Sequence, residues 1–169
     1  MKKREIIINS DHALVPLTQE KFAIIDLEDV DKIKNYTWQA LKWKNKRYYA
    51  VTTKRKNNKR WMILMHRFIM NAPNNLQVDH INYNETLNNK KSNLRLCTNT
   101  QNNFNKPPMK GCKSKYKDVV YRKNLWMASI QINGKKVYLG TYDSEIKAAL
   151  AYDNIAKKHI GEFAYLNFP

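Results

Sequence analysis

Short apolar runs separated by polar residues make up the first third of the chain. They lie at Ile6–Ile8, Phe22–Ile25 and Tyr48–Val51. Runs of this length, rich in β-branched and aromatic residues, indicate short strands. Between them, residues 26–36 predict a short helix, because Val30 and Ile33 fall on one side of it.

The middle third has the same character but carries more asparagine. A basic turn at residues 54–60 precedes an apolar run at 61–65 and a strand that ends at 78–80. An asparagine-rich loop at residues 82–93 leads to a strand at 94–96. Thr98 and Gln101 have the spacing of a capping box, which predicts a helix start, and the Lys106-Pro107-Pro108 run ends that helix.

The last third shows the clearest alternation. Trp126, Ala128, Ile130 and Ile132 fall on one face of a strand over residues 125–132. A strand over residues 119–122 precedes it, and Asn133-Gly134 predicts a tight hairpin to a strand over 135–141. A helix with an apolar stripe of Ala148, Tyr152, Ile155 and Ala156 begins at Asp143 or Ser144 and ends at Gly161. The pattern predicts a three-stranded antiparallel sheet backed by one helix.

These elements predict an α+β protein with two domains. The first covers residues 1–106, a linker covers 107–114, and the second covers 115–169. The linker has turn and charge signals and no periodic apolar face. The two cores are therefore expected to be separate.

Positive charge is spread over both domains. The chain of 169 residues carries 31 Lys and Arg against 14 Asp and Glu, a formal net charge of +17. Residues 1–106 hold 20 basic and 9 acidic residues, and residues 107–169 hold 11 and 5. A field of this sign attracts a polyanion, and nucleic acid is the commonest one. A membrane surface is disfavoured because no long basic amphipathic helix is present in the pattern.

Cysteine usage and the N-terminus suggest where the protein resides. Cys97 and Cys112 form no Cys-x-x-Cys pair, so a zinc ribbon is not expected. Two thiols suit a reducing interior. The apolar run after Arg4 is too short for a signal peptide. We expect a soluble, cytoplasmic protein that is not secreted.

Three blocks in the middle of the chain carry the candidate chemistry. They are Val78-Asp79-His80-Ile81-Asn82, Ser92–Thr98 and Gln101-Asn102-Asn103, preceded by Met65-His66-Arg67-Phe68-Ile69. In this order and spacing they resemble the His-Asn-His (HNH) motif of homing endonucleases from phages and bacterial mobile elements, with a motif core at about residues 61–105. Such a source would place the protein in the cytoplasm of a bacterium or phage-infected host.

The resemblance implies a ββα-metal (His-Me finger) fold and a role for each matched residue. His80 would be the general base and Asn93 would hold the loop and help orient it. Asp79 and Asn102 would hold one divalent metal, Mg²⁺ first and Mn²⁺ second, with no zinc. Cleavage would leave 5′-phosphate and 3′-hydroxyl ends. His66 is expected to be structural or, with Arg67, to contact DNA.

Residues 115–169 resemble the plant APETALA/ethylene-response-factor DNA-binding domain. The matching stretches include Trp126–Ile130, Val137–Asp143, Ala148–Asp153 and Leu166–Pro169. In that family the sheet lies in the major groove. Matched DNA-facing positions are Lys117, Arg122, Gln131, Lys136 and Tyr138. Val120 stands where the family has arginine, Ser129 where it has glutamate and Asp118 where it has glycine, so plant target sequences are not expected to transfer.

The sequence therefore favours a site-specific, homing-type endonuclease acting on double-stranded DNA. The alternative is a transcription regulator whose nuclease fold is a relic. An RNA-binding protein ranks last, because no glycine-aromatic RNA-recognition motif is present. Monomer and homodimer both stay open, as do a nick and a double-strand break, a homing or a restriction role, and the target sequence.

Overall fold

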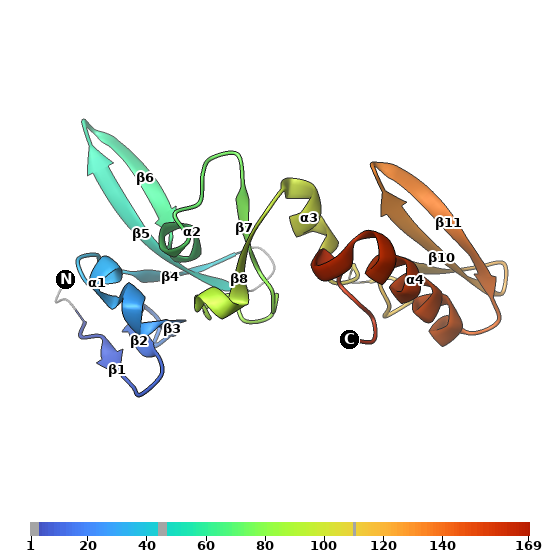
Figure 1. The fold of residues 1–169 in the computed structure, drawn as a ribbon, viewed down its shortest axis with the longest axis horizontal. Coiled ribbons are helices and arrows are strands. Elements are labelled where there is room, and N and C mark those ends of the chain that lie inside the picture. The colour runs from blue at the N-terminus through green and yellow to red at the C-terminus, as the bar shows by residue number, and fades with distance from the viewer. Residues whose placement is uncertain (1–3, 44–46, 110) are drawn as a thin grey trace. The chain divides into compact units, whose positions relative to one another are not determined.

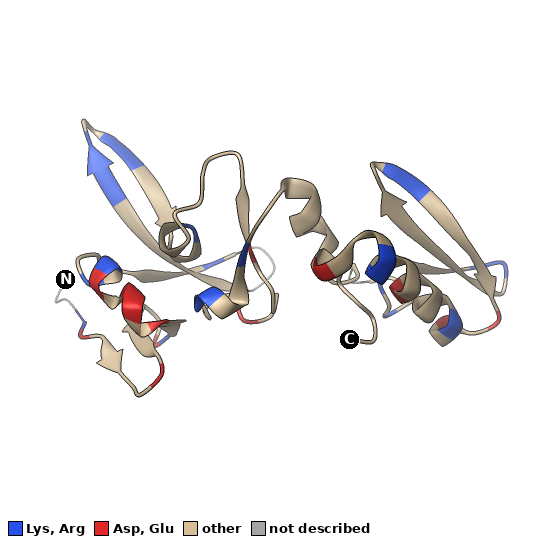
Figure 2. Cartoon of the chain, viewed as in Figure 1, with Lys and Arg blue, Asp and Glu red and all other residues tan. Residues whose placement is uncertain are grey.

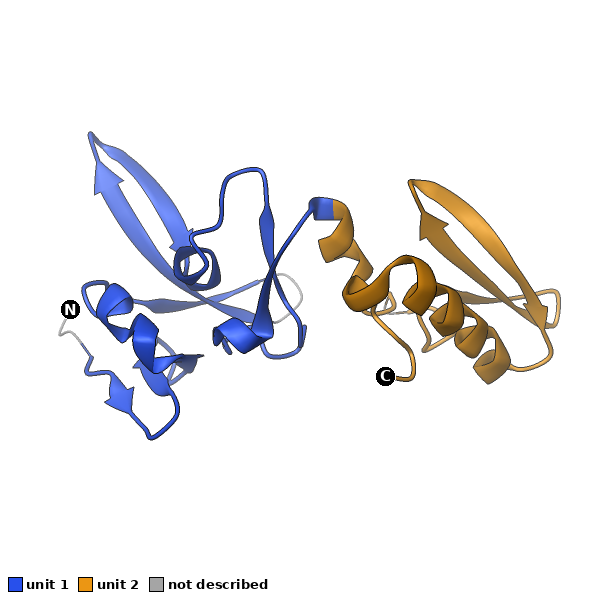
Figure 3. Cartoon of the chain, viewed as in Figure 1, with its two compact units in different colours: residues 1–99 blue, residues 100–169 orange. Residues whose placement is uncertain are grey.

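The computed structural model describes residues 4–43, 47–109 and 111–169. The strands form several small antiparallel sheets, and short helices lie between them along the chain (Figure 1). The predicted α+β class is therefore confirmed. The chain forms two compact units, residues 1–99 and 100–169 (Figure 3). The predicted linker includes Lys110, which lies outside the described residues. Within the described part of the chain, no helix is long and apolar enough to cross a membrane.

The first unit begins with two small sheets and a short helical segment. Its first sheet has the strand order β1-β2-β3 and its second has the order β4-β5-β6. The strands are β1 (Ile7–Ile8), β2 (Ala13–Pro16), β3 (Phe22–Ile25), β4 (Gln39–Lys42), β5 (Tyr48–Lys56) and β6 (Lys59–Leu64). Between β3 and β4, η1 (Leu27–Asp29) and α1 (Val30–Ile33) form the helix predicted over residues 26–36.

The rest of the first unit holds the first two blocks of the motif, including His80 and Asn93. Helix α2 (Met65–Ile69) follows β6 directly, and β7 (Gln77–His80) pairs with β8 (Leu94–Cys97) in a two-stranded antiparallel sheet. A short η2 turn (Lys91–Asn93) immediately precedes β8. The core that supports these elements consists of buried apolar side chains: Ala13, Val15, Leu17, Ala23, Ile25, Ile33, Trp38, Ala40, Ala50, Met65, Ile69, Val78 and Leu94.

Two predictions for this region need correction. The basic segment at residues 54–60 was predicted to be a turn, but β5 and β6 continue through it and the turn is only Asn57-Asn58. Both asparagines have positive φ, 49° and 58°, which a two-residue hairpin turn requires. The second correction is α2, where the sequence suggested only the end of a strand, because five residues are too few to show helical periodicity.

The second unit holds α3 (Asn99–Phe104) from its second residue onward, and then a sheet of the order β11-β10-β9. The strands are β9 (Val119–Arg122), β10 (Leu125–Ile132) and β11 (Lys135–Tyr142). Helix α4 (Glu145–His159) begins after Ser144, packs on the sheet and is followed by η3 (Gly161–Phe163).

Small side chains allow α4 to lie close to the sheet. Ala148, Ala149 and Ala156 are fully buried, and Tyr152 fills the remaining space beside Ile130. Ala148, Tyr152 and Ala156 belong to the stripe that the sequence predicted, whose fourth member Ile155 is partly buried, whereas Ala149 was not part of that prediction. At the hairpin, Asn133 and Gly134 have positive φ of 49° and 76°, as the predicted turn requires.

Candidate active site

His80 lies at the last position of β7 and its side chain is buried, with 5% of its surface exposed. Its ring meets the His66 ring at 4.9 Å between centroids and the Tyr49 ring at 6.0 Å, both edge to face. Its Nε2 lies 3.3 Å from Oδ1 of Asn89. Burial lowers the pKa of His80 to about 4, although Asn89 and Asp79 act in the opposite direction. The ring is therefore neutral near pH 7 and able to accept a proton.

Asp79 is held by an arginine from the neighbouring strand. The β7–β8 register places Arg95 opposite Asp79, and the guanidinium donates to one carboxylate oxygen, Oδ2, from Nε at 3.0 Å and Nη2 at 2.8 Å. Both side chains are largely buried. Sequence reasoning did not assign Arg95 a role. The antiparallel pairing of the two predicted strands, with an acid in one and a base in the other, was the available signal.

Asn93 closes the loop between β7 and β8. Its Oδ1 accepts from the backbone N–H of Asn82 at 2.9 Å, and its Nδ2 donates to the carbonyl of Asn88 at 2.9 Å. The N–H of Ile81 donates to the carbonyl of Asn93 at 2.8 Å. Asn89, which the sequence did not single out within its many asparagines, places its Oδ1 3.3 Å from Nε2 of His80. An orienting role for Asn93 stays a prediction.

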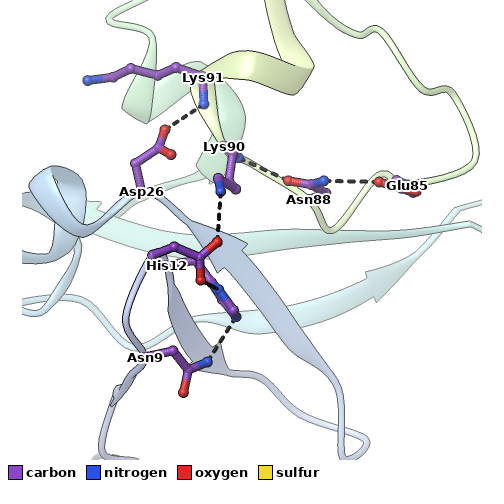
Figure 4. Close-up of polar contacts among 8 residues, drawn as sticks. Asn9, His12, Asp26, Glu85, Asn88, Lys90 and Lys91 are labelled. Carbon is purple, nitrogen blue, oxygen red and sulfur yellow. Dashed lines mark hydrogen bonds and ion pairs between the residues drawn. The ribbon is translucent and has the colours of Figure 1, made fainter.

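The same loop is attached to the N-terminal sheet by charged contacts (Figure 4). The backbone N–H of Lys91 donates to Asp26 at 2.7 Å, and the Lys90 ammonium lies 3.6 Å from Asp11. The Lys91 ammonium also pairs with Glu28. These contacts link residues separated by more than sixty positions, so the loop next to His80 has a fixed place on the first unit.

His66 and Arg67 lie on α2. His66 is buried against His80, and burial, followed by the charge effects of His80 and Arg67, lowers its pKa to about 3. Arg67 donates to the carbonyls of Leu76 at 2.7 Å and Pro73 at 3.0 Å, which fixes the turn before β7. Arg67 therefore has internal hydrogen-bond partners, whereas His66 packs against the Tyr49 and His80 rings and its buried Nδ1 has no hydrogen-bond partner among the described residues. Their assignment as DNA contacts stays a prediction.

Asn102, the second predicted metal ligand, lies on α3 in the second unit. Its side chain is half-buried. The neighbouring Asn103 accepts a hydrogen bond from the Lys106 ammonium at 2.5 Å. The role of Asn102 stays a prediction.

Strand pairing places four of the predicted DNA-facing residues on one face of the β9–β11 sheet. Arg122 opposes Leu125, Gln131 opposes Lys136, and Tyr138 opposes Ser129, and alternation puts all of these on the face away from α4. Arg122, Gln131, Lys136 and Tyr138 are all exposed. Val120, on the edge strand β9, lies on the same face and is exposed, so this surface also carries an apolar side chain.

Lys117 does not share that surface. It is 8% exposed, and its ammonium donates to the carbonyls of Phe104 and Lys106, each at 2.6 Å. Burial lowers the pKa of Lys117 to about 8. The expectation that Lys117 faces DNA is therefore wrong in this structure: the side chain instead binds the C-terminal end of α3.

A cavity of about 690 Å³ lies elsewhere in the first unit. Its lining includes Ile6, Val15, Tyr36 and Trp38, and it contains none of the predicted site residues. A long polyanion needs an open surface, so a cavity at His80 is not required for the chemistry.

Comparisons with known proteins match both parts of the chain. A protein of Acanthamoeba polyphaga mimivirus, named an uncharacterized HNH endonuclease, is 38% identical over 109 residues, 61% of this chain and 56% of its own length. An AP2-like ethylene-responsive transcription factor of Arabidopsis thaliana is 44% identical over 55 residues, 32% of this chain and 16% of its own length. The ethylene-responsive transcription factor WRI1 of the same plant is 46% identical over 50 residues, 30% of this chain and 12% of its own length.

Both halves of the resemblance are therefore supported. The chain is similar to a protein named an HNH endonuclease over 109 residues and to a plant AP2-like factor over 55 residues. It spans about half the length of the mimivirus relative and less than a fifth of either plant protein. No protein-family model and no solved structure matches the chain.

Proposed function

We propose that this protein is an endonuclease that hydrolyses phosphodiesters of double-stranded DNA at selected sites, leaving 5′-phosphate and 3′-hydroxyl ends. One observation carries the proposal. His80 and Asp79, successive motif residues at the end of β7, are both buried, with Asn89 at hydrogen-bond distance from His80 and Arg95 paired with Asp79. A neutral imidazole can accept a proton from water, and a carboxylate can hold a divalent metal.

The donor atoms suit one divalent metal of the Mg²⁺ type. Asp79 has two carboxylate oxygens, of which Oδ2 receives the Arg95 contacts, and Asn102 would add an amide oxygen. Hard oxygen ligands of this kind favour Mg²⁺ or Mn²⁺ over zinc. When bound, the metal would supply charge stabilisation at the leaving 3′ oxygen. In this proposal β7 and β8 supply the two strands of the ββα-metal fold.

His80 then acts as the general base. Its neutral ring takes a proton from the attacking water, and the water oxygen forms a bond to phosphorus as the bond to the 3′ oxygen breaks. A pKa of about 4 makes a weak base. The negative charge of a bound phosphate would favour the imidazolium and raise that pKa toward neutrality.

The outer face of β9–β11 would grip the major groove through Arg122, Gln131, Lys136 and Tyr138. A second module raises the local concentration of the nuclease at its site. One active site cuts one strand, so a double-strand break would require a second copy or a second binding event.

The test is a comparison of His80→Ala with a matched substitution, His159→Ala, at an exposed histidine on α4. We expect His80→Ala to slow cleavage by about 10²–10⁴-fold while DNA affinity changes little. His159→Ala should cleave normally, and excess chelator should stop the wild-type enzyme. Equal loss of binding and cleavage would make His80 structural. A wild-type chain that binds DNA but does not cleave it, whichever divalent metal is added, would favour the regulator with a relic nuclease fold.

A further inference from the structure

The loop residue Asn89 is fully buried and held on both its backbone and its side chain. Its backbone N–H donates to the carbonyl of Ile24 at 2.7 Å, and the N–H of Ile24 donates to Leu87 at 2.9 Å. Residues 87–89 therefore run along β3 as a short parallel pairing, with a bridge between Ile24 and Asn88. A side chain on such a segment has little freedom to move.

The partners of the Asn89 amide fix which end faces His80. Its Nδ2 donates to the carbonyl of Leu87 at 3.1 Å and lies 3.6 Å from the sulfur of Met65. Both of these atoms are acceptors, so the NH₂ group belongs on that side. The carbonyl oxygen Oδ1 consequently faces Nε2 of His80 at 3.3 Å.

An amide oxygen can only accept a hydrogen bond, so Nε2 of His80 must carry the hydrogen. A neutral imidazole carries one hydrogen, which leaves Nδ1 with the lone pair. We propose that Asn89 is the positioning residue of this site: it holds His80 in the Nε2–H tautomer and thereby makes Nδ1 the atom that takes the proton from water. This inference rests on the proposed nuclease function.

The proposal assigns different tasks to two asparagines of the same loop. Asn93 bonds to the backbone at Asn82 and Asn88 and so sets the loop's path. Asn89 sets the protonation pattern of the base. During the reaction the bond from Nε2–H to Oδ1 persists, and it stabilises the imidazolium formed when Nδ1 takes the second proton. The imidazolium afterwards returns that proton to solvent.

The first experiment reads the tautomer without any cleavage assay. In the full chain labelled with ¹⁵N-histidine, long-range ¹H–¹⁵N correlations near neutral pH distinguish the protonated from the unprotonated ring nitrogen. We expect His80 to carry its hydrogen on Nε2. A hydrogen on Nδ1 in the wild-type chain would overturn the proposal, and this result would stand even if the protein failed to cleave DNA.

The second experiment compares three variants. Asn89→Leu keeps the volume but removes the acceptor, and we expect kcat to fall by roughly 10²-fold with little change in KM and with loss of the pure Nε2–H signal. Asn89→Asp keeps an acceptor at Nε2, so the hydrogen should stay on Nε2, but its negative charge favours the imidazolium and should move the rise of the pH–rate profile to higher pH. Asn88→Leu is the matched control, since the Asn88 amide bonds to Glu85 and Lys90, and it should cleave normally.

Two outcomes would contradict the assignment. One is a wild-type rate in Asn89→Leu. The other is an equal loss in Asn88→Leu and Asn89→Leu, which would make the integrity of the loop the cause. If Asn89→Leu does not fold, the tautomers of the wild-type chain and of Asn89→Asp decide the question.

Discussion

The buried charge of Asp79 is compensated by a residue sixteen positions away in the sequence, Arg95. Asp79 and Arg95 are both largely buried and share a short ion pair. Removing one member of a buried pair leaves an uncompensated charge, which typically costs roughly 3–5 kcal/mol. We predict that Arg95→Met destabilises the first unit by an amount in this range, measured by urea denaturation. Asp79→Asn combined with Arg95→Met should recover part of the loss. Unchanged stability in Arg95→Met would show that the pair contributes nothing.

His66 predicts a pH dependence of stability. Its pKa falls from 6.5 to about 3 on folding, chiefly because the ring is buried. Between these values the unfolded chain binds the proton and the folded chain does not, so acid favours unfolding. Stability should be fully present above about pH 6.5 and decline as the pH falls, with His66 contributing at most about 1.4 kcal/mol per pH unit.

The check is a series of denaturation midpoints across this pH range for the wild type, His66→Phe and the exposed-site control His159→Phe. His66→Phe should flatten the decline and His159→Phe should not. A decline that is equally steep in all three proteins would refute the role of His66.

At this scale the sequence could identify the residues of the motif but not their partners. The Asp79-His80 pair and Asn93 have a recognisable spacing, whereas Asn89 is one of several asparagines in its loop and owes its importance to β3 packing against it. Lys117 shows the reverse error. Family position suggested an exposed contact, but the carbonyls at the end of α3 bind its ammonium.

At the scale of elements, the β5–β6 hairpin concentrates positive charge near its turn (Figure 2). Arg55 opposes Arg60 and Lys56 opposes Lys59 across the strands, and all four are exposed. Like charges directly opposite each other destabilise a sheet by a few tenths to about 1 kcal/mol. A polyanion bound there would offset that cost.

We therefore predict two opposite effects for the double substitution Lys56→Gln and Lys59→Gln. Thermal stability should rise slightly, because the repulsion is removed. DNA affinity should fall, and the slope of log affinity against log salt concentration should become shallower by up to about two, one for each lysine removed. Lys157→Gln with Lys158→Gln on α4 is a charge-matched control. An unchanged salt slope in the hairpin variant would mean that the hairpin does not contact DNA.

The outer face of β9–β11 makes a separate prediction. If Arg122 reads a base, Arg122→Ala should relax preference at one position of the target, at a cost of about 1–3 kcal/mol there. If it contacts only phosphate, binding should weaken equally on all sequences. Selection from a randomised DNA pool distinguishes the two. Selection identical to wild type would remove Arg122 from the interface.

The second unit was predictable from sequence because apolar residues alternate along β10 and Asn133-Gly134 marks the turn, although the β10–β11 register shifts between Ala128 and Ser129. The first unit was less so. Its strands are mostly short and α2 has five residues, so no period develops, and long-range packing decides where each element ends.

At the scale of the whole molecule, the first domain was predicted to end at residue 106, whereas the first compact unit ends at residue 99. Residues 100–104 of α3 belong to the second unit, where the carbonyl of Phe104 accepts from Lys117 and from the backbone of Tyr165. Because the first core lies within residues 13–94, a fragment of residues 1–106 should still fold. In this fragment the Phe104 carbonyl no longer accepts hydrogen bonds from Lys117 and Tyr165.

We predict that this fragment unfolds cooperatively and retains some cleavage, with weaker affinity and poorer site choice than the full chain. Footprinting and denaturation of the fragment and the full chain provide the comparison. A fragment that binds as tightly and as selectively as the full chain would show that the second unit is not the DNA anchor.

The central claim is that the chain cuts DNA through His80 with a divalent metal. The most direct measurement is incubation of the full chain with a plasmid library and Mg²⁺, followed by sequencing of every new end, with His80→Ala in parallel. The account predicts recurrent cut sites with 5′-phosphate and 3′-hydroxyl ends from the wild type and almost none from His80→Ala. The same ends in excess chelator, or equal cutting by His80→Ala, would contradict it.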